Sequence, residues 1–545
     1  MQHSKPSRRQ FLQSGIRSGA GAVALPGLRR ARDASVHGIA ESSVRPFALD
    51  EVSIVALQEG MKSGKFTARS LVDEYLRRIE EIDRNGPALK SVIEVNPDAR
   101  AIAEALDKER KAKGARGPMH GIPILIKDNI GTRDRMSTTA GSLALVGSRP
   151  PADSFVVERL REAGAVILGK TNLSEWANIR SSHSTSGWSA RGGLTRNPYA
   201  LDRNACGSSS GSGAAVAANL CAVAVGTETD GSIVCPSSAN GIVGIKPTLG
   251  LVSRYGIIPI AHSQDTAGPM ARTVTDAAIL LGALAEIDPR DSATTESRGK
   301  AVRDYTQFLD PKGLRGSRIG VVRKLFGFHD RVDRMTNAAM EEMKRQGAEL
   351  IDPVAIESLG KFDDSEQEIL LYELKADLNA YLAALGPGSP VHSLKEVIDF
   401  NERHRDKEMP FFGQDLFVKA EGKGPLTDKP YLDALEKNHR LTRAEGIDAV
   451  MEKNHLDALI APTGGPAWLT DLVDGDHDLG GSSSLPAVAG YPNINVPAGF
   501  VFGLPVGIAF FGRAYGEPTL IKLAYAFEQA TRVRQAPKFL RSAKV

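Results

Sequence analysis

The feature that most constrains the fold is a repeated alternation of short apolar segments with amphipathic helical segments. The first apolar run, "GIPILIKDNI" at 121–130, begins at a glycine, ends in polar residues, and predicts a buried strand. Residues 155–177 then read as a helix, a glycine turn and a second apolar strand, "AVILGK". Strands that alternate with helices predict an α/β domain in which helices cover a β-sheet. Further strands are expected at 221–228, 456–463 and within 482–512, and residues 241–260 are expected to continue the pattern of strands and loops.

Apolar residues three and four positions apart indicate where the helices lie. Surface helices are predicted at 67–82, 97–113, 273–287 and 518–532, with a short helix of small residues at 214–220. Residues 290–440 are more charged and richer in helix formers, so we expect a helical region that shapes access to a site. Because no internal repeat or Pro/Ser-rich linker divides residues 45–540, one large catalytic domain is favoured over several.

The first forty residues differ in composition from the rest of the chain. Arg8 and Arg9 in "SRRQFLQSGI" precede a run of small and apolar residues that extends to about Leu25. The segment resembles a twin-arginine export signal, and it is too short and interrupted by Arg17 to span a bilayer. The alternative is a disordered basic tail. We expect residues 1–40 to be a signal and flexible tail, and the mature protein to be periplasmic, with the cytoplasm as the alternative location.

Charge balance and cysteine content disfavour several classes of protein. The formal net charge is +3 and no basic stripe is present, so no nucleic-acid partner is expected. Cys206, Cys221 and Cys235 match no zinc-binding spacing. Because an odd number of cysteines cannot form a complete disulfide framework, we expect at least two of them to be small buried apolar residues. No ligand cluster suggests a metal or an organic cofactor.

A run of small polar residues, "NACGSSSGSGA" at 204–214, is the main candidate for chemistry. Gly207, Ser209 and Gly211 match G-x-S-x-G, the strand-to-helix turn that carries the nucleophile of α/β-hydrolase esterases. The segment ahead of it, "NPYALDRNAC", is polar and rich in turn residues, so the required strand is missing. A phosphate-binding loop is also disfavoured, because no G-K-[ST] follows and G-x-G-x-x-G after a strand is not met.

A wider window gives a different interpretation of the same serines. Residues 207–247 resemble the signature block of the amidase signature family. Outside this block, other segments also resemble sequences of that family: "GIPILIKDNI", "AGAVILGKTNLSEWA", "DTAGPMAR" and "LPAVAGYPNINVPAG". The resemblance extends over most of residues 47–530 and is weakest at 290–440. It implies a single large α/β domain with a central mixed, mostly parallel β-sheet covered by helices on both faces. It also implies a serine amidohydrolase that requires no cofactor.

The resemblance implies a Ser/Ser/Lys triad. The family's catalytic lysine ends an apolar strand and precedes Asp, which makes it Lys127. The bridging serine, often preceded by a cis peptide bond, is Ser208, and the nucleophile is Ser232 in "DGSI", 24 residues later. Lys170 in "LGKTN" is the competing lysine, for which a structural role is expected. Local hydrogen bonding or helix capping is expected for the other serines of the run, Ser209, Ser210 and Ser212.

The chemistry of amide cleavage fits these residue types. An amide is a poor electrophile with a poor leaving group, so hydrolysis needs an activated nucleophile, a proton for the nitrogen and donors for the oxyanion. A lysine accepts a proton only when neutral, and burial lowers its pKa from about 10.4. Neutral Lys127 would take a proton from Ser208 while Ser208 takes one from Ser232, which attacks to form an acyl-enzyme. The expected oxyanion hole consists of the backbone N–H groups of Thr229, Asp230, Gly231 and Ser232.

Departures from the family pattern bear on the substrate. The nucleophile block reads "TDGSIV", where Asp230 either bonds to substrate or backbone or pairs elsewhere, and Cys206 replaces a glycine before Ser208. These variants resemble the peptide amidase branch, which implies peptide C-terminal amides as substrates. The alternatives are a broad aliphatic or aryl amidase, a glutaminase subunit for transfer-RNA-dependent amidation, and a binding homologue without activity. The expected partner is a small-molecule or short-peptide amide, and no stable membrane insertion is expected.

Overall fold

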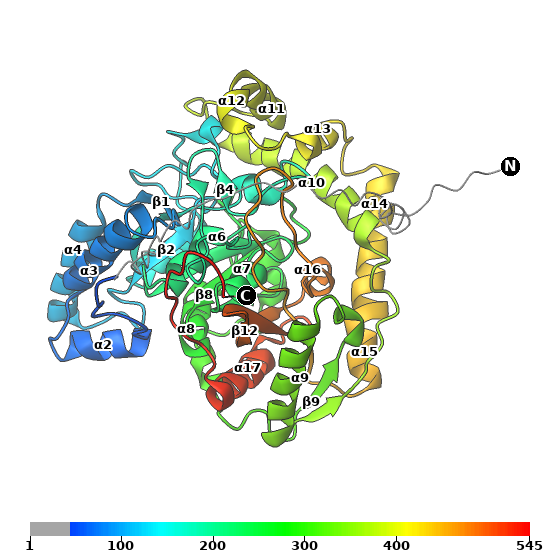
Figure 1. Cartoon of the computed structure of the whole chain (residues 1–545). Helices are drawn as coiled ribbons and strands as arrows, with labels where there is room; N and C mark the ends of the chain where they lie inside the picture. Colours follow the sequence, from blue (N-terminus) through cyan, green and yellow to red (C-terminus); the bar gives the residue numbers. More distant parts are fainter. Residues whose placement is uncertain (1–43, 545) are drawn as a thin grey trace, which may run out of the picture. The chain divides into compact units, whose positions relative to one another are not determined.

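One large sheet dominates the computed structural model, which describes residues 44–544. The predicted export signal at 1–40 lies outside the described residues. The sheet has eleven strands (Figure 1). In spatial order they are β1 (Val92–Val95), β3 (Val166–Thr171), β2 (Pro123–Lys127), β6 (Val223–Glu228), β8 (Thr266–Ala271), β7 (Val243–Lys246), β12 (Asn493–Val501), β13 (Leu504–Phe511), β11 (Ala458–Pro462), β9 (Arg318–Val321) and β10 (Glu349–Ile351). A separate two-stranded sheet pairs β4 (Trp188–Ser189) with β5 (Gly193–Leu194).

The α/β class and the mixed sheet are confirmed, but most neighbouring strands are antiparallel. Only β2 with β3 and β6, and β9 with β10 and β11, run parallel among the described strands. The remaining neighbours in the sheet pair in antiparallel fashion. Two residues, Phe502 and Gly503, connect β12 to β13, and so short a connection joins only antiparallel strands. The prediction of a mostly parallel sheet is therefore wrong.

Helices flank the sheet, and the first long one follows the predicted segment closely. The Thr67 side chain accepts from the backbone N–H of Ser70, and the Ser70 hydroxyl accepts from that of Thr67, which starts α3 with a capping box. A π-helical turn at Ile79–Arg84 extends α3, so the helix predicted at 67–82 is confirmed. The α-helices are α2 (Ile54–Lys62), α3 (Ala68–Arg78), α4 (Ala99–Lys113), α5 (Phe155–Glu162), α6 (Ser210–Ala217), α7 (Val234–Ala239), α8 (Val274–Leu284), α9 (Asp330–Arg345), α10 (Asp363–Ala384), α11 (Leu394–Arg403), α12 (Arg405–Glu408), α13 (Asp415–Glu421), α14 (Lys429–His439), α15 (Asp448–Lys453), α16 (Ser484–Ala489) and α17 (Glu517–Thr531).

Two parts of the predicted strand-and-loop pattern contain no regular strand. Residues 250–260 form turns, one of which places Gly256 at φ +76° and closes with the Ile257 N–H donating to the Arg254 carbonyl at 3.0 Å. Within 482–512, the first part is the short helix α16, which ends at Gly490 in the left-handed region. In both places local turn chemistry outweighs the apolar pattern.

Residues 290–440 contribute both to the sheet and to a separate helical layer. β9 and β10 are the last two strands at one edge of the sheet, and α9 connects them. The helices α10 to α14 lie together in Figure 1. Leu374 and Leu378 of α10 are buried in a cluster with Trp176 and Ile258. The helical layer is therefore packed against the loops that follow β3 and β7.

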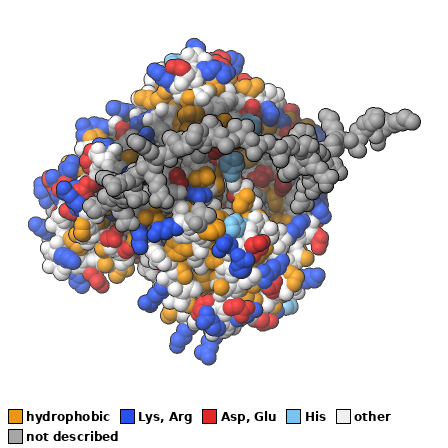
Figure 2. Space-filling view, in the orientation of Figure 1, with side chains coloured by type: hydrophobic (Ala, Val, Ile, Leu, Met, Phe, Trp, Pro, Cys, Tyr) orange, Lys and Arg blue, Asp and Glu red, His pale blue; other side chains and the backbone are white. Residues whose placement is uncertain are grey.

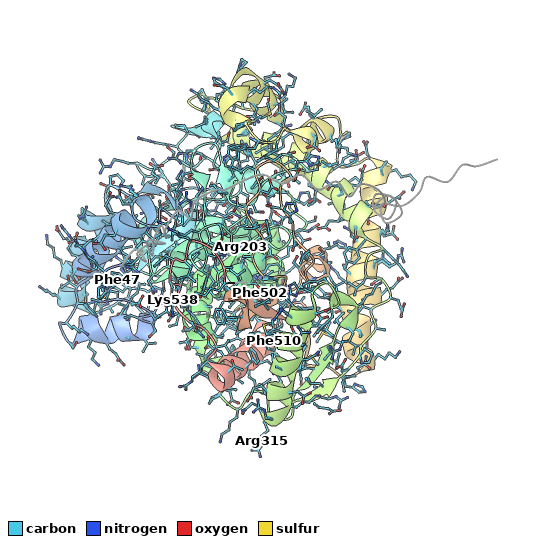
Figure 3. All side chains as sticks on the ribbon, in the orientation of Figure 1. Phe47, Arg203, Arg315, Phe502, Phe510 and Lys538 are labelled. Carbon is cyan, nitrogen blue, oxygen red and sulfur yellow. A yellow bond between two sulfur atoms is a disulfide. The ribbon has the colours of Figure 1, made fainter. Side chains whose placement is uncertain are left out.

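The core is built where the sheet meets α17. Phe510 on β13, labelled in Figure 3, and Phe527 on α17 are fully buried, with ring centroids 5.9 Å apart. Figure 2 shows acidic and basic side chains interspersed on one face, as the nearly balanced charge predicts. No helix in residues 44–544 is long and apolar enough to cross a membrane.

Candidate active site

Lys127 lies at the end of β2, fully buried, with its amine against one residue of the serine run. Its Nζ is 2.8 Å from Ser208 Oγ, 2.8 Å from Thr227 Oγ1 and 3.1 Å from the Thr227 carbonyl oxygen. Thr227 belongs to β6, which pairs in parallel with β2. A neutral amine has two N–H groups and one lone pair, so it can donate to Thr227 and accept from the Ser208 hydroxyl.

Burial is the main influence on the charge of Lys127. It lowers the pKa of the amine to about 7, although the carboxylates of Asp265 and Glu228 oppose the shift. These two carboxylates are held by other donors: Asp265 accepts from Thr229 Oγ1 at 2.6 Å, and Glu228 from the N–H of Ile233 at 2.7 Å. A large neutral fraction of Lys127 is therefore present near neutral pH.

Ser208 is held in a tightly packed backbone. A cis peptide bond links Gly207 to Ser208, as the resemblance implied, and the Ser208 carbonyl accepts from the Ser174 N–H at 3.1 Å. A Cβ at position 207 would lie 2.1 Å from Ser174 Oγ, so only glycine fits there. The close packing fixes the direction of the Ser208 hydroxyl toward Lys127.

Ser232 lies in the turn between β6 and α7, next to Ser208. The Ser209 N–H donates to the Ser232 carbonyl at 3.1 Å, which places the two segments side by side. Glu228 accepts from the N–H groups of Ile233 and Val234 at 2.7 and 3.0 Å and so fixes the start of α7. Among the described residues no hydrogen bond joins the Ser208 and Ser232 hydroxyls, so the second proton transfer belongs to the proposal below.

The turn before Ser232 presents free backbone donors. The N–H groups of residues 229–232 have no hydrogen-bond acceptor within residues 44–544, and Gly231 has φ +76°. The Thr229 side chain is anchored on Asp265, and the Asp230 carboxylate accepts from Ser484 Oγ at 2.6 Å. The other oxygen of this carboxylate, Oδ1, is buried with no hydrogen-bond partner within residues 44–544, so pairing with Ser484 is observed and a contact of Asp230 with substrate stays a prediction. Free N–H groups in a buried turn are the geometry that an oxyanion hole requires.

The competing lysine and the other serines of the 204–214 run make hydrogen bonds to nearby backbone and side-chain groups. Lys170 Nζ donates to the Ile130 carbonyl at 2.6 Å and to Thr138 Oγ1 at 2.8 Å, and burial lowers its pKa to about 8. It therefore holds the loop after β2. Ser209 is the residue directly before α6, and its Oγ donates to the Thr227 carbonyl at 3.0 Å. No strand leads into it, whereas the nucleophile turn of an esterase follows a strand. Ser210 and Ser212 likewise donate to backbone carbonyls.

Two of the three cysteines are bonded to each other, which corrects the sequence prediction. A disulfide joins Cys206 to Cys235, and Cys221 is a buried free thiol. The odd count was misleading because one cysteine is simply left over. The predicted proximity of Ser208 and Ser232 could have suggested this pairing, since each bonded cysteine lies within three residues of one of them.

Three residues of the site were missed by the sequence analysis: Thr227, Glu228 and Asp265. Thr227 meets Lys127 across two neighbouring strands and Asp265 meets Thr229 from another loop, whereas Glu228 accepts from N–H groups a few residues further along the chain. No spacing in the sequence indicates such contacts.

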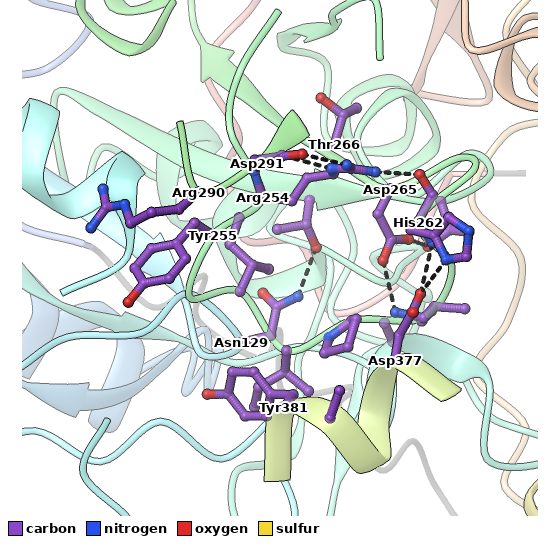
Figure 4. A pocket seen from close by; sticks show the side chains of 18 of the residues that line it. Asn129, Arg254, Tyr255, His262, Asp265, Thr266, Arg290, Asp291, Asp377 and Tyr381 are labelled. Atoms are coloured by element: carbon purple, nitrogen blue, oxygen red, sulfur yellow. Dashed lines mark hydrogen bonds and ion pairs between the residues drawn. The ribbon is translucent and has the colours of Figure 1, made fainter. Parts of the chain in front are cut away.

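A pocket of about 390 Å³ opens beside the turn at residues 229–232, and Figure 4 shows side chains that line it. Thr227, Thr229 and Asn129 line one part of it, and Tyr255, Ile257, Ile258 and Tyr381 give it apolar surface. Charged side chains line the rest: Arg254, Asp265, Arg290, Asp291 and Asp377. The pocket can therefore hold an apolar group close to the site.

One group at the pocket rim has side chains of the kind that ligate metals. Donor atoms of His262, Glu373 and Asp377 lie within 4.8 Å of one another. Both ring nitrogens of His262 already face carboxylates, Asp377 at 2.8 Å (Figure 4) and Glu373 at 3.3 Å, and the hydrogen bond that the imidazole donates to Asp377 raises its pKa. The group is an ion-pair network that ties the 257–265 loop to α10.

Comparison with known proteins identifies the family. The family model described as amidase matches residues 70–521. The chain belongs to the amidase signature family. It is similar to a peptide amidase solved in complex with the competitive inhibitor chymostatin, at 51% identity and a TM-score of 0.88 over 90% of this chain and 100% of that one. It is 44% identical to a probable amidase of Arabidopsis thaliana, over 91% of this chain and 93% of the relative. A glutamyl-tRNA(Gln) amidotransferase subunit from Halorhodospira halophila is 35% identical, over 89% of this chain and 98% of the relative. This amidase is therefore a hydrolase of amide bonds.

The burial of Lys127 predicts an acid limb in the pH profile of amide hydrolysis. We expect kcat/KM to rise tenfold per pH unit up to a pKa of about 7 and then to level off, because the protonated amine cannot accept a proton. Since the Asp265 carboxylate raises the pKa of Lys127, D265N should shift the limb to lower pH. A limb near pH 10 in the native enzyme would contradict the assignment.

Proposed function

We propose that this amidase removes the C-terminal amide of peptides, giving a free carboxylate and ammonia, through an acyl-enzyme on Ser232. The observation that carries the proposal is the buried Lys127 amine, which lies 2.8 Å from Ser208 Oγ. The next residue, Ser209, donates its backbone N–H to the Ser232 carbonyl, so Ser208 lies beside the segment that carries Ser232. A base of lowered pKa next to a hydroxyl is the arrangement that serine activation requires.

Formation of the tetrahedral intermediate moves two protons and forms one bond. Neutral Lys127 accepts the Ser208 proton while Ser208 accepts the Ser232 proton, and Ser232 Oγ attacks the carboxamide carbon. The carbonyl oxygen becomes an oxyanion at the free N–H groups of residues 229–232. Because these donors are already oriented by the turn, they need no rearrangement when the charge develops.

Release of ammonia and hydrolysis of the acyl-enzyme then return the protons. Lys127, now charged, passes a proton through Ser208 to the amide nitrogen, and the C–N bond breaks to release ammonia. Water then enters, gives up a proton along the same path, and attacks the acyl carbon. As the ester bond breaks, Lys127 returns this proton through Ser208 to Ser232 Oγ, and the acid product leaves and ionises to a carboxylate in solvent, with Lys127 neutral again.

The choice of peptide amides rests on two observations. The similar peptide amidase binds chymostatin competitively, and its likeness to this chain extends over 90% of the residues. The pocket beside Thr229 has apolar surface that suits a side chain next to the scissile carboxamide. These observations favour a peptide amide over glutamine, whose side chain is short and polar.

Substitution of the three residues tests the mechanism. S232A should lower kcat for ammonia release by at least about 10⁴-fold, and K127A by about 10²- to 10⁴-fold, because nucleophile and base are lost. S209A is the matched control in the same run and should change kcat by less than about threefold, since its hydroxyl contacts only the Thr227 backbone. Full activity in S232A would refute the mechanism, and an inactive S209A with active S232A would restore the esterase-type interpretation.

A substrate panel tests the specificity. We expect kcat/KM for ammonia release to be highest with peptide amides that carry an apolar C-terminal residue, compared with glutamine, acetamide and benzamide. Preference for the simple amides would support a broad aliphatic or aryl amidase instead. Preference for glutamine would support the glutaminase alternative, and the absence of any hydrolysis would support a binding homologue.

We further propose that the enzyme is exported by the twin-arginine route. The Cys206–Cys235 disulfide supports this location, because disulfides persist in oxidising compartments such as the periplasm. Residues 1–45 fused to a folded reporter should direct it to the periplasm, and replacing Arg8 and Arg9 by lysine should abolish export. A reporter that stays cytoplasmic with both arginines present would favour the cytoplasmic alternative.

A further inference from the structure

A covalent bond ties together the two segments that carry Ser208 and Ser232. Cys206 lies two residues before Ser208, Cys235 lies three residues after Ser232, and their Cα atoms are 6.0 Å apart. The disulfide therefore joins the backbone on either side of the two hydroxyls rather than a remote loop.

The chain between each sulfur and its serine is short and held in place. The Cys206 N–H donates to Asn204 Oδ1 at 2.7 Å, and Asn204 Nδ2 donates to the Ser186 carbonyl at 2.9 Å. On the other side, the Cys235 N–H donates to the Gly231 carbonyl at 2.8 Å in the first turn of α7. A displacement of either cysteine would therefore shift the short segment that carries Ser208 or Ser232.

A second contact joins the same two segments on the other side of Ser208. The Ser209 N–H donates to the Ser232 carbonyl at 3.1 Å. Ser208 thus lies between a covalent link at Cys206 and a hydrogen bond at Ser209, both made to the segment that carries Ser232. Together the two links hold the backbone segments that carry Ser208 and Ser232 side by side.

We propose that Cys206 and Cys235 are positioning residues, whose disulfide holds Ser208 and Ser232 in register for proton transfer, so that the amidase is fully active only when oxidised. The inference rests on the proposed roles of the two serines. The two cysteines act through the serines and touch neither substrate nor the reacting atoms. A loss of register of about 1 Å lowers turnover by up to about 100-fold in other enzymes.

Reduction breaks this link in a defined way. Dithiothreitol supplies two electrons and two protons, the S–S bond breaks to give two thiols, and the reductant is oxidised to its cyclic disulfide. Cys206 is buried, whereas Cys235 is half-buried and gives the reductant access. Cys221 is fully buried, and burial raises the pKa of its thiol to about 12, so it remains a thiol throughout.

The state of the cysteines is measured first. Full-length enzyme is denatured and alkylated with iodoacetamide, and its mass is determined before and after treatment with dithiothreitol. One added group before reduction and three after it are expected, because only Cys221 starts as a thiol. Three added groups without reductant would overturn the proposal.

Kinetics then separate positioning from stability. On reduction we expect kcat for a peptide amide to fall about 10- to 100-fold with KM changed less than about twofold, and to recover on reoxidation with glutathione disulfide. The near-ultraviolet circular dichroism should stay native at the assay temperature. Loss of that signal together with activity would overturn the positioning role in favour of a purely stabilising one, and an unchanged kcat would overturn it outright.

Variants and a chemical probe complete the test. C221A should respond to reduction as the native enzyme does, whereas C206A/C235A should have the low kcat of the reduced enzyme and no response. If the double variant does not fold, reduction of native protein decides the matter. An oxidised enzyme that hydrolyses no amide would refute the proposed function. The disulfide is then tested separately by the rate at which a fluorophosphonate labels Ser232, which should be slower after reduction.

Discussion

The burial of the Lys127 amine at the end of a central strand is the constraint on which the site depends. A charged lysine there would lose its hydration, so burial lowers the pKa to about 7 and makes a neutral base available. The same burial requires hydrogen-bond partners, which Ser208 and Thr227 provide at 2.8 Å. The parallel pairing of β2 with β6 brings Thr227 to the amine. The strand order is thus directly tied to the chemistry.

Carboxylates around the site organise its backbone, and Asp265 also lines the pocket. Glu228 accepts from two N–H groups at the start of α7, and Asp265 anchors Thr229 together with two N–H groups of the 260–261 loop. These bonds leave the N–H groups of residues 229–232 free within the described chain. The disulfide between Cys206 and Cys235 adds a covalent link where the serine segments meet. Several independent ties therefore hold one turn in place.

The sequence predicted elements well where the pattern was long or bounded by clear caps. The helix at 67–82 and the strand at 221–228 are present as α3 with its π-helical turn and as β6, because periodicity and capping agree there. The strand expected at the start of 482–512 is a helix that ends at Gly490, and the strand-and-loop pattern expected to residue 260 ends in turns at Gly256. Strand direction also escaped prediction, because it depends on connections such as the tight β12–β13 turn.

The sequence by itself determined the residue types of the site and their order: Lys127 after an apolar strand, Ser208 in a glycine-rich run, and Ser232 in a glycine turn. It could not determine which contacts they make. Three lysines, Lys127, Lys170 and Lys246, end up fully buried, yet only Lys127 meets Ser208, because β2 lies between β3 and β6. Only the tertiary structure paired Cys206 with Cys235 and placed Asp265 on Thr229. Such contacts depend on the packing of distant segments, which local sequence patterns do not encode.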